Sequence, residues 1–449
     1  MLLLWILTFF FTSQDVVPVQ VEGRIRPFDV VMDEAILEYV RHEAPPTLHP
    51  ELPLQHELTS LTSPLRAVPS RWEPSVWIGL EAFSYPGLRN FTAYSEAHFQ
   101  LLQHQFLSWK KGETNFKPVA EALALSYNEW AGKPLLEAHG TTFYFPTWGQ
   151  LYAEMLYFKW PFLEATLLLY LLALFLFLVS PSLWALKGGW LAYGSGWVMH
   201  TLILGLRMYI LGRPPVSNMM ETVIYVPWIA VTLAALLSLY FKTRLLPFMA
   251  TLLATILLAL LMVTPASLDQ VQPVLNSRYW LTVHVLMIVA SYGVLILCGL
   301  LAHADLIISL RTGRHPLTSL ILTTLYLGVA LLIPGTILGG VWAAESWGRF
   351  WDWDPKESWA FISASIYLLV IHAYTFKKID SQGLAIGAIS GLIAIAFTWY
   401  GVNYILGTGL HSYGFGSGGT FPFVLFVAVE GLFLGSVFFL KKSPRWDKS

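Results

Sequence analysis

The chain has 449 residues, of which 55% are hydrophobic and only 12% are charged. A typical soluble domain carries about 25% charged residues, so this composition excludes a disordered chain and argues against an ordinary soluble protein. A formal net charge of −1 offers no basic surface for nucleic acid. The single cysteine, Cys298, excludes an internal disulfide and a C-x-x-C redox or zinc site, and its apolar surroundings predict a buried side chain.

The N-terminal third differs from the rest of the chain. Residues 1–12 are apolar but shorter than the ~20 residues of a membrane-spanning helix, which indicates a signal-like or anchor segment. Residues 13–159 are polar and contain prolines. Helical periodicity over Asp29–Arg41 and Ser95–Lys110 predicts a small, mainly helical soluble domain there.

Three histidines of this domain, His42, His49 and His56, are spaced seven residues apart, as in a metal-binding stripe along a helix. Prolines between them forbid one continuous helix. We therefore interpret them as solvent-exposed side chains.

Residues 160–441 form a series of apolar runs that predict an all-α, polytopic membrane domain. We expect about nine transmembrane helices, or ten if the N-terminal segment also crosses the membrane. The expected spans are residues 161–180, 190–211, 222–241, 245–264, 280–303, 320–341, 357–376, 383–404 and 421–440.

Lysines and arginines in the connections predict the orientation. One alternating set of connections, counted with the C-terminal segment, holds eleven of them, and the other set holds four. Cytoplasmic loops carry the positive excess, so the first set and the tail at 442–449 are expected in the cytoplasm. The N-terminal domain and the connections near 212–221, 265–279, 342–356 and 405–420 are then extracytoplasmic.

A tryptophan-rich loop at 340–359 lies on the predicted outer side. Six aromatic residues fall within eighteen positions: Trp342, Trp347, Phe350, Trp351, Trp353 and Trp359. An interface belt supplies about one or two at each helix end, so we interpret this loop as an apolar platform for a large planar ligand. If the loop is helical, Trp347 and Trp351 share one face.

The loop ends in Asp354-Pro355-Lys356-Glu357, which is typical of a helix start. Asp354 fits the N-cap, Pro355 the first helical position, and Glu357 a capping box. A direct ligand contact by Asp354 is about equally compatible with the sequence. Capping does not account for the tryptophans.

The pattern W-x-x-x-x-W-G-x-x-W-x-W-D-P-K-E at 342–357 resembles the WWD signature of the haem-handling proteins of cytochrome c biogenesis. The best match is the CcsA (ResC) family of System II. The resemblance covers about 190–415 and includes the segments at 212–222, 279–285 and 401–415. It implies haem b as the bound substrate, a CcsB/ResB-like membrane subunit and apocytochrome c as partners, and the bacterial cytoplasmic membrane as the location.

The resemblance also implies that two outward histidines ligate haem iron, and His284 and His411 match them. Both lie on the predicted outer side, and six-coordinate haem needs one neutral imidazole on each face. Trp342, Trp347, Trp351, Trp353 and Asp354 complete the implied outer site. Glycines around His411 make its loop compliant.

A second haem site within the membrane is implied by the resemblance, with His372 as one ligand. His372 follows Pro355 by seventeen residues, about 25 Å of helix, and so lies near the predicted cytoplasmic end. The family takes the other ligand from the partner. His303 and, less well placed, His200 are candidates in this chain, and hydrogen bonding between helices is the alternative role of each.

Haem also carries two propionates. Arg213, Arg349 and Lys356 are candidates to pair with them. The alternative for each is anchoring at lipid headgroups.

We therefore expect a cytochrome c synthase of haem-lyase type, working with the partner subunit. It would move haem to the outer face and present it for thioether attachment to apocytochrome C-x-x-C-H motifs, whose thiols belong to the substrate. The alternative is a haem-delivery subunit of a larger complex without synthase activity of its own; a transporter of another planar ligand is a weaker hypothesis. For residues 13–159 we expect recognition of the apocytochrome or of a partner.

Overall fold

The computed structural model describes residues 18–21, 24–27, 66–69, 77–79, 83, 94–115, 117–138, 141–179, 183–262, 277–409 and 419–442. The chain divides into two compact units, residues 1–161 and 162–449. Several predictions fall outside the described residues: the N-terminal apolar segment, the helix at Asp29–Arg41, the three spaced histidines, His411 and the tail from 443.

The first unit combines helices with short strands. Its described helices are α5 (Glu96–Lys110), α6 (Lys117–Tyr127) and α7 (Trp148–Lys159). The helix predicted over Ser95–Lys110 is confirmed, and the Ser95 side chain caps it by accepting from the His98 backbone N–H.

The sequence pattern had not indicated the strands of this unit. Four of them form an antiparallel sheet in the order β2-β1-β3-β4, and the other two form a hairpin. Their bounds are β1 (Pro18–Val21), β2 (Arg24–Pro27), β3 (Arg66–Pro69), β4 (Trp77–Gly79), β5 (Pro134–Ala138) and β6 (Thr141–Tyr144). Strands of three to five residues are too short for a period-two pattern to stand out.

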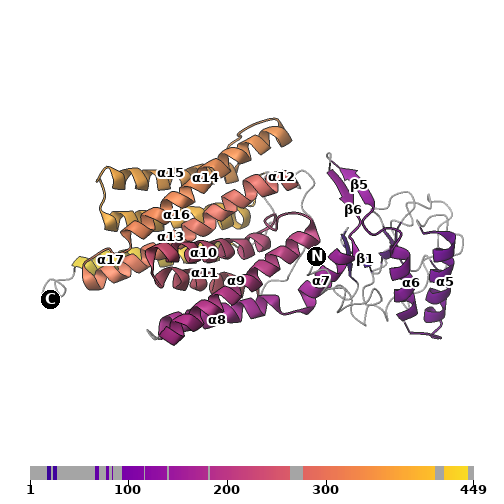
Figure 1. Cartoon of the computed structure of the whole chain (residues 1–449). Coiled ribbons are helices and arrows are strands. Elements are labelled where there is room, and N and C mark those ends of the chain that lie inside the picture. Colours follow the sequence, from indigo (N-terminus) through magenta and orange to yellow (C-terminus); the bar gives the residue numbers. More distant parts are fainter. Residues whose placement is uncertain are drawn as a thin grey trace. The chain divides into compact units, whose positions relative to one another are not determined.

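Each of the nine apolar runs forms a helix in the described part of the second unit (Figure 1). The helices are α8 (Phe162–Val179), α9 (Leu183–Leu211), α10 (Met219–Phe241), α11 (Leu245–Leu261), α12 (Arg278–Trp280) continuing through η5 (Leu281–Val285) into α13 (Leu286–Thr312), α14 (Thr318–Trp347), α15 (Pro355–Thr375), α16 (Ser381–Ala396) continuing into η6 (Phe397–Leu406), and α17 (Thr420–Lys442). Seven of the nine are long and apolar enough to cross a membrane, and the other two are α9 and α11. The prediction of an all-helical, multi-pass membrane domain is confirmed.

Helix α13 lies at the centre of this unit. It packs against α10, α14, α16 and α17, and its apolar stretch is the most deeply buried of the candidate spans. Glycines permit the close packing: a Cβ on Gly299 would lie 2.8 Å from Leu392 Cδ2, and one on Gly293 would lie 2.6 Å from the Val226 carbonyl oxygen. Small residues play this role between membrane helices because packing drives their association. Cys298 is fully buried in the same helix, as predicted.

The outer surface of the second unit is apolar. Exposed leucines and phenylalanines cover α8 and α17, among them Leu178 at 71% exposure and Phe439 at 75%. Such a surface is unfavourable in water and is what lipid chains cover in a bilayer.

Candidate functional site

A cavity with about 800 Å³ of empty space, partly open to solvent, lies at one end of the second unit. Its walls come from the first turn of α10, from η5 and α13, from the last third of α14, from the start of α15, and from η6. These segments are far apart in the sequence, and they adjoin connections that the charge pattern assigned to a single membrane side. Most lining side chains are apolar, and a few polar groups stand among them, which is the usual composition of a small-molecule site.

His284 lies in the wall of this cavity with a fixed orientation. Its Nδ1 lies 2.8 Å from the backbone carbonyl oxygen of Gly335 on α14. A carbonyl only accepts, so Nδ1 carries the proton and Nε2 carries the lone pair. The ring also packs edge-on against Trp342 at 5.9 Å between centroids. A backbone carbonyl that fixes the tautomer of a histidine is the usual outer-shell partner of a metal-ligating imidazole.

The close approach of α14 to His284 depends on glycines. A Cβ on Gly339 would lie 2.6 Å from His284 Cε1, and one on Gly335 would lie 3.2 Å from Ile288 Cβ. Larger residues at these positions would displace the imidazole or the helix.

Two π-helical segments border the cavity. The first, η5, carries His284, and the second, η6, carries Trp399 and Asn403. A π-helical turn adds a residue to the helix and changes which side chains face inward, and such turns are frequent at functional sites. Neither segment could be predicted from the sequence, because hydrophobic periodicity does not distinguish α- from π-helical turns over five to ten residues.

The expected aromatic platform is divided among three places. Trp342 and Trp347 belong to α14 and pack with Trp280, whose Nε1 donates to Glu345 at 2.7 Å. Trp351 lines the cavity. Trp353 is 70% exposed with a positive φ of 58°, which is rare for a bulky residue.

The loop that joins α14 to α15 is shorter than 340–359, because α14 continues to Trp347 and α15 begins at Pro355. Gly348, in the left-handed conformation, ends α14, so the segment is not helical from Trp347 to Trp351 and the condition for a shared helix face is not met. Of the other two aromatics, Phe350 is half exposed and Trp359 packs on Phe397 at 4.1 Å.

The capping role of Asp354 is confirmed. Its carboxylate accepts from the Lys356 backbone N–H at 2.9 Å, and Glu357 accepts from the backbone N–H groups of Asp352 and Asp354. Gly409, with a φ of 109°, lies directly against this cap, since a Cβ there would be 2.3 Å from Asp354 Oδ2. The chain leading to His411, two residues further on, is thus packed on the end of the tryptophan loop.

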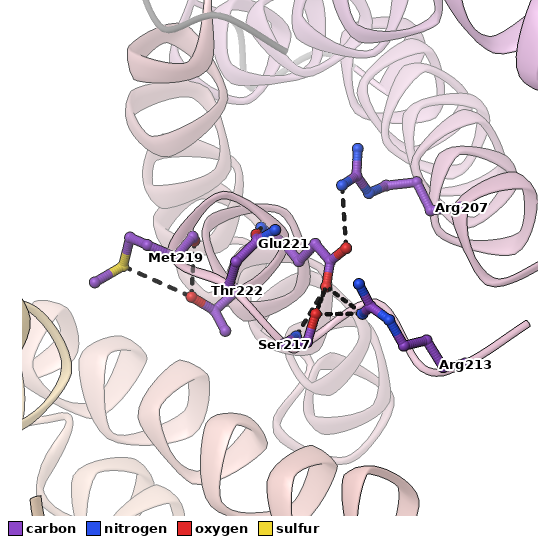
Figure 2. A network of polar contacts seen from close by, with 7 residues as sticks. Arg207, Arg213, Ser217, Met219, Glu221 and Thr222 are labelled. Carbon is purple, nitrogen blue, oxygen red and sulfur yellow. Dashed lines mark hydrogen bonds and ion pairs between the residues drawn. The ribbon is translucent and has the colours of Figure 1, made fainter. Parts of the chain in front are cut away.

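A buried ionic network next to the cavity holds Arg213 (Figure 2). Glu221 is fully buried and pairs with Arg207 at 3.2 Å and with Arg213 at 3.1 Å. The Ser217 backbone N–H and hydroxyl also donate to Glu221, at 2.8 and 2.7 Å, and Ser217 lines the cavity. This network fixes the turn between α9 and α10, and of its members the sequence had singled out Arg213 but neither Arg207 nor Glu221.

The other two predicted cations differ in position. Arg349 pairs with Asp352 at 3.0 Å and lies over the Trp347 ring, and it does not line the cavity. Lys356 does line it. The Lys356 ammonium donates to Asn403 Oδ1 at 2.8 Å and to the Trp399 carbonyl at 3.3 Å.

The three other histidines considered as haem ligands have distinct surroundings. His200 is fully buried, with Nε2 2.9 Å from the Ile224 carbonyl and Nδ1 3.2 Å from the Tyr170 hydroxyl, which indicates a structural role. His303 contacts Glu430 of α17 at 2.8 Å and the Gly299 carbonyl at 2.8 Å. His372 is exposed near the far end of α15, with Nδ1 2.7 Å from the Leu368 carbonyl.

These features define a polytopic helical membrane protein with a cavity at one end of its membrane domain. Comparison with known proteins identifies its family. The family model described as "Cytochrome C assembly protein" matches residues 216–411, the segment that builds the cavity. Cytochrome c biogenesis protein CcsA of Prochlorococcus marinus is 34% identical over 251 residues, which cover 48% of this chain and 80% of that protein. The chain therefore belongs to the CcsA family of cytochrome c biogenesis proteins.

Two further proteins are similar to this chain. Protein NrfI of Wolinella succinogenes is 38% identical over 237 residues, which cover 49% of this chain but only 25% of NrfI. The chain thus spans a quarter of the length of that relative. The solved structure of the cytochrome c haem lyase CcmF is similar with a TM-score of 0.43 and 16% identity, over 62% of this chain and 50% of that one.

Proposed function

We propose that this chain binds haem in the cavity beside His284 and presents it for covalent attachment to apocytochrome c, as a cytochrome c synthase of haem-lyase type. The observation that carries the proposal is the hydrogen bond of 2.8 Å from His284 Nδ1 to the Gly335 carbonyl oxygen. It leaves Nε2 as the unprotonated nitrogen, which is the one that can bind iron. The apolar walls and Trp351 suit a large planar ligand.

His411 is the second axial ligand in this proposal. The close packing of Gly409 on Asp354 supports it, because it anchors the approach to His411 on the cap that ends the tryptophan loop. Asp354 then acts through the position of that loop, in addition to starting α15. Trp342 supports His284 by packing against its ring, and Trp347 packs on the cluster of Trp280 and Trp342.

The chemistry requires positioning above all. Each substrate cysteine adds S–H across a haem vinyl group: a carbon–sulfur bond forms, the hydrogen goes to the other vinyl carbon, and no external oxidant is consumed. The cavity would hold the haem while the C-x-x-C-H segment approaches from its open side, so that a bimolecular reaction becomes an oriented one. The substrate histidine would replace one outward histidine when the product leaves.

A second haem position at His372 belongs to the proposal, with its other ligand supplied by a CcsB/ResB-like subunit. The exposure of His372 supports a ligand from another chain. The two internal candidates are less suitable, because His200 is enclosed by its own hydrogen bonds and His303 is paired with Glu430. In this proposal the chain lies in the bacterial cytoplasmic membrane with His372 near the cytoplasmic side. The cavity, the first unit and the substrate are then on the outer side.

Expression in a bacterium that lacks cytochrome c maturation tests the proposal. The chain would be produced with and without a CcsB-like subunit, and haem that stays attached to a reporter apocytochrome after denaturation would be stained in gels. Covalent product in either case supports synthase activity. Haem copurifying with the chain but no product in both cases would favour the alternative, a haem-delivery subunit of a larger complex.

Replacing the axial ligands tests the site itself. His284→Gly and His411→Gly are each expected to abolish attachment, and added imidazole is expected to restore part of it by filling the space. His200→Phe serves as the matched control, since that histidine lies outside the cavity lining. Full activity in both glycine variants would remove these residues as ligands.

A further inference from the structure

We infer that Lys356 is the cavity residue that recognises a carboxylate of the bound ligand, so that the site selects an anionic porphyrin over a neutral one. This inference rests on the proposed haem function and adds its charge selectivity. The inference is drawn from the surroundings of the Lys356 ammonium group. These surroundings differ from those of Arg213 and Arg349, the two arginines predicted as propionate partners.

Lys356 lines the cavity, and so do the residues that accept from its ammonium group. Both of its acceptors, Asn403 Oδ1 at 2.8 Å and the Trp399 carbonyl at 3.3 Å, belong to residues that line the same cavity. An ammonium has three hydrogens to donate, and within the described residues these two acceptors account for two of them. One N–H is left for a ligand.

Both acceptors are neutral, so within the described part of the chain the Lys356 ammonium is hydrogen-bonded but forms no ion pair. The two carboxylates within two residues of Lys356 both hold the start of α15: Asp354 accepts from the Lys356 backbone N–H, and Glu357 accepts from the N–H groups of Asp352 and Asp354. Among the described residues no carboxylate oxygen lies within 4.0 Å of the Lys356 ammonium, whereas Arg349 has such a partner in Asp352. Arg213 is also paired, with Glu221.

Placing an ammonium against apolar walls is unfavourable unless an opposite charge joins it. A ligand carboxylate on Lys356 would supply that charge through a short, charge-assisted bond. Because His284 lines the same cavity, one ligand that carries both a metal and a carboxylate would satisfy both residues. Haem, with its propionates, has this combination.

The test compares haem with its dimethyl ester, which has the same iron and ring but no negative carboxylates. The purified 449-residue chain in detergent would be titrated with each ligand, and the dissociation constants read from the Soret band. A charge-assisted hydrogen bond contributes on the order of tenfold or more in affinity, so the wild type is expected to prefer haem over the ester by about that factor. The comparison on the wild type needs no substitution and does not depend on a variant folding.

Lys356→Met keeps the approximate length of the side chain and removes its charge. It is expected to bring the ratio of the two dissociation constants, ester to haem, close to one. Lys356→Arg is expected to keep the preference for haem. Lys187→Met, at an exposed lysine of α9 over Trp184, is the matched control and should keep the full preference.

The outcomes separate the two proposals. If the wild type binds both ligands equally, or if Lys356→Met discriminates as well as the wild type, the role of Lys356 is wrong while haem binding stands. If neither ligand gives a Soret band shifted by protein, the proposed haem site fails and this inference fails with it.

Discussion

Gly339→Ala is the sharpest single test of the His284 site. The new Cβ would lie 2.6 Å from His284 Cε1 and 3.2 Å from both ring nitrogens. Carbon atoms in contact are about 3.5–4.0 Å apart, so the ring must move by roughly 1 Å. The bond from Nδ1 to the Gly335 carbonyl, now 2.8 Å, cannot be kept after such a shift in its present geometry.

The expected loss is in ligand binding, with little loss of fold. Disturbing the outer-shell partner of a metal ligand lowers affinity by about 10–100-fold, or roughly 1.4–2.7 kcal/mol. Alanine is about 0.5–1 kcal/mol better than glycine inside a helix, which offsets part of the steric strain in the folded state. Haem affinity would be measured by Soret titration, and stability by thermal unfolding in detergent.

Gly205→Ala provides the matched control. It makes the same substitution inside α9, where an added Cβ meets nothing within 4 Å. We expect unchanged haem affinity and equal or slightly higher stability. A Gly339→Ala protein with wild-type affinity and wild-type axial ligation would refute the reasoning that α14 fixes the imidazole.

Substitutions at three other residues separate structural from ligand-binding roles. Asp354→Ala is expected to lower the unfolding free energy by about 1 kcal/mol, whereas Asp354→Asn keeps the cap. If the Asp354→Asn protein nevertheless loses haem, Asp354 contacts the ligand directly. Glu221→Leu leaves two buried arginines without their shared carboxylate and is expected to cost about 3–5 kcal/mol, seen as a large drop in melting temperature; a small drop would show that water reaches the network. His200→Phe is expected to cost about 1–3 kcal/mol through its two lost hydrogen bonds and to leave haem content per molecule unchanged; reduced haem content in a well-folded protein would contradict its structural role.

The membrane fold and the start of α15 could both be predicted from the sequence. A run of about 20 apolar residues crosses a bilayer as a helix, because a helix of that length spans the hydrocarbon and satisfies its own backbone hydrogen bonds. The cap at Asp354-Pro355-Lys356-Glu357 is equally local, since its contacts span three residues. The WWD pattern identified the family for the same reason: it is one continuous stretch of sequence.

Which side chains meet in the cavity could not be predicted, because they come from segments far apart in the sequence. Trp342 and Trp347 looked like part of a ligand platform, but the continuation of α14 places them against Trp280. The contacts of Trp399 and Asn403 with Lys356 could not be predicted, because they depend on the π-helical segment that carries both residues. The role of a charged residue depends on its partners in space: Arg213 has Glu221, Arg349 has Asp352, and Lys356 has two neutral oxygens and an open cavity.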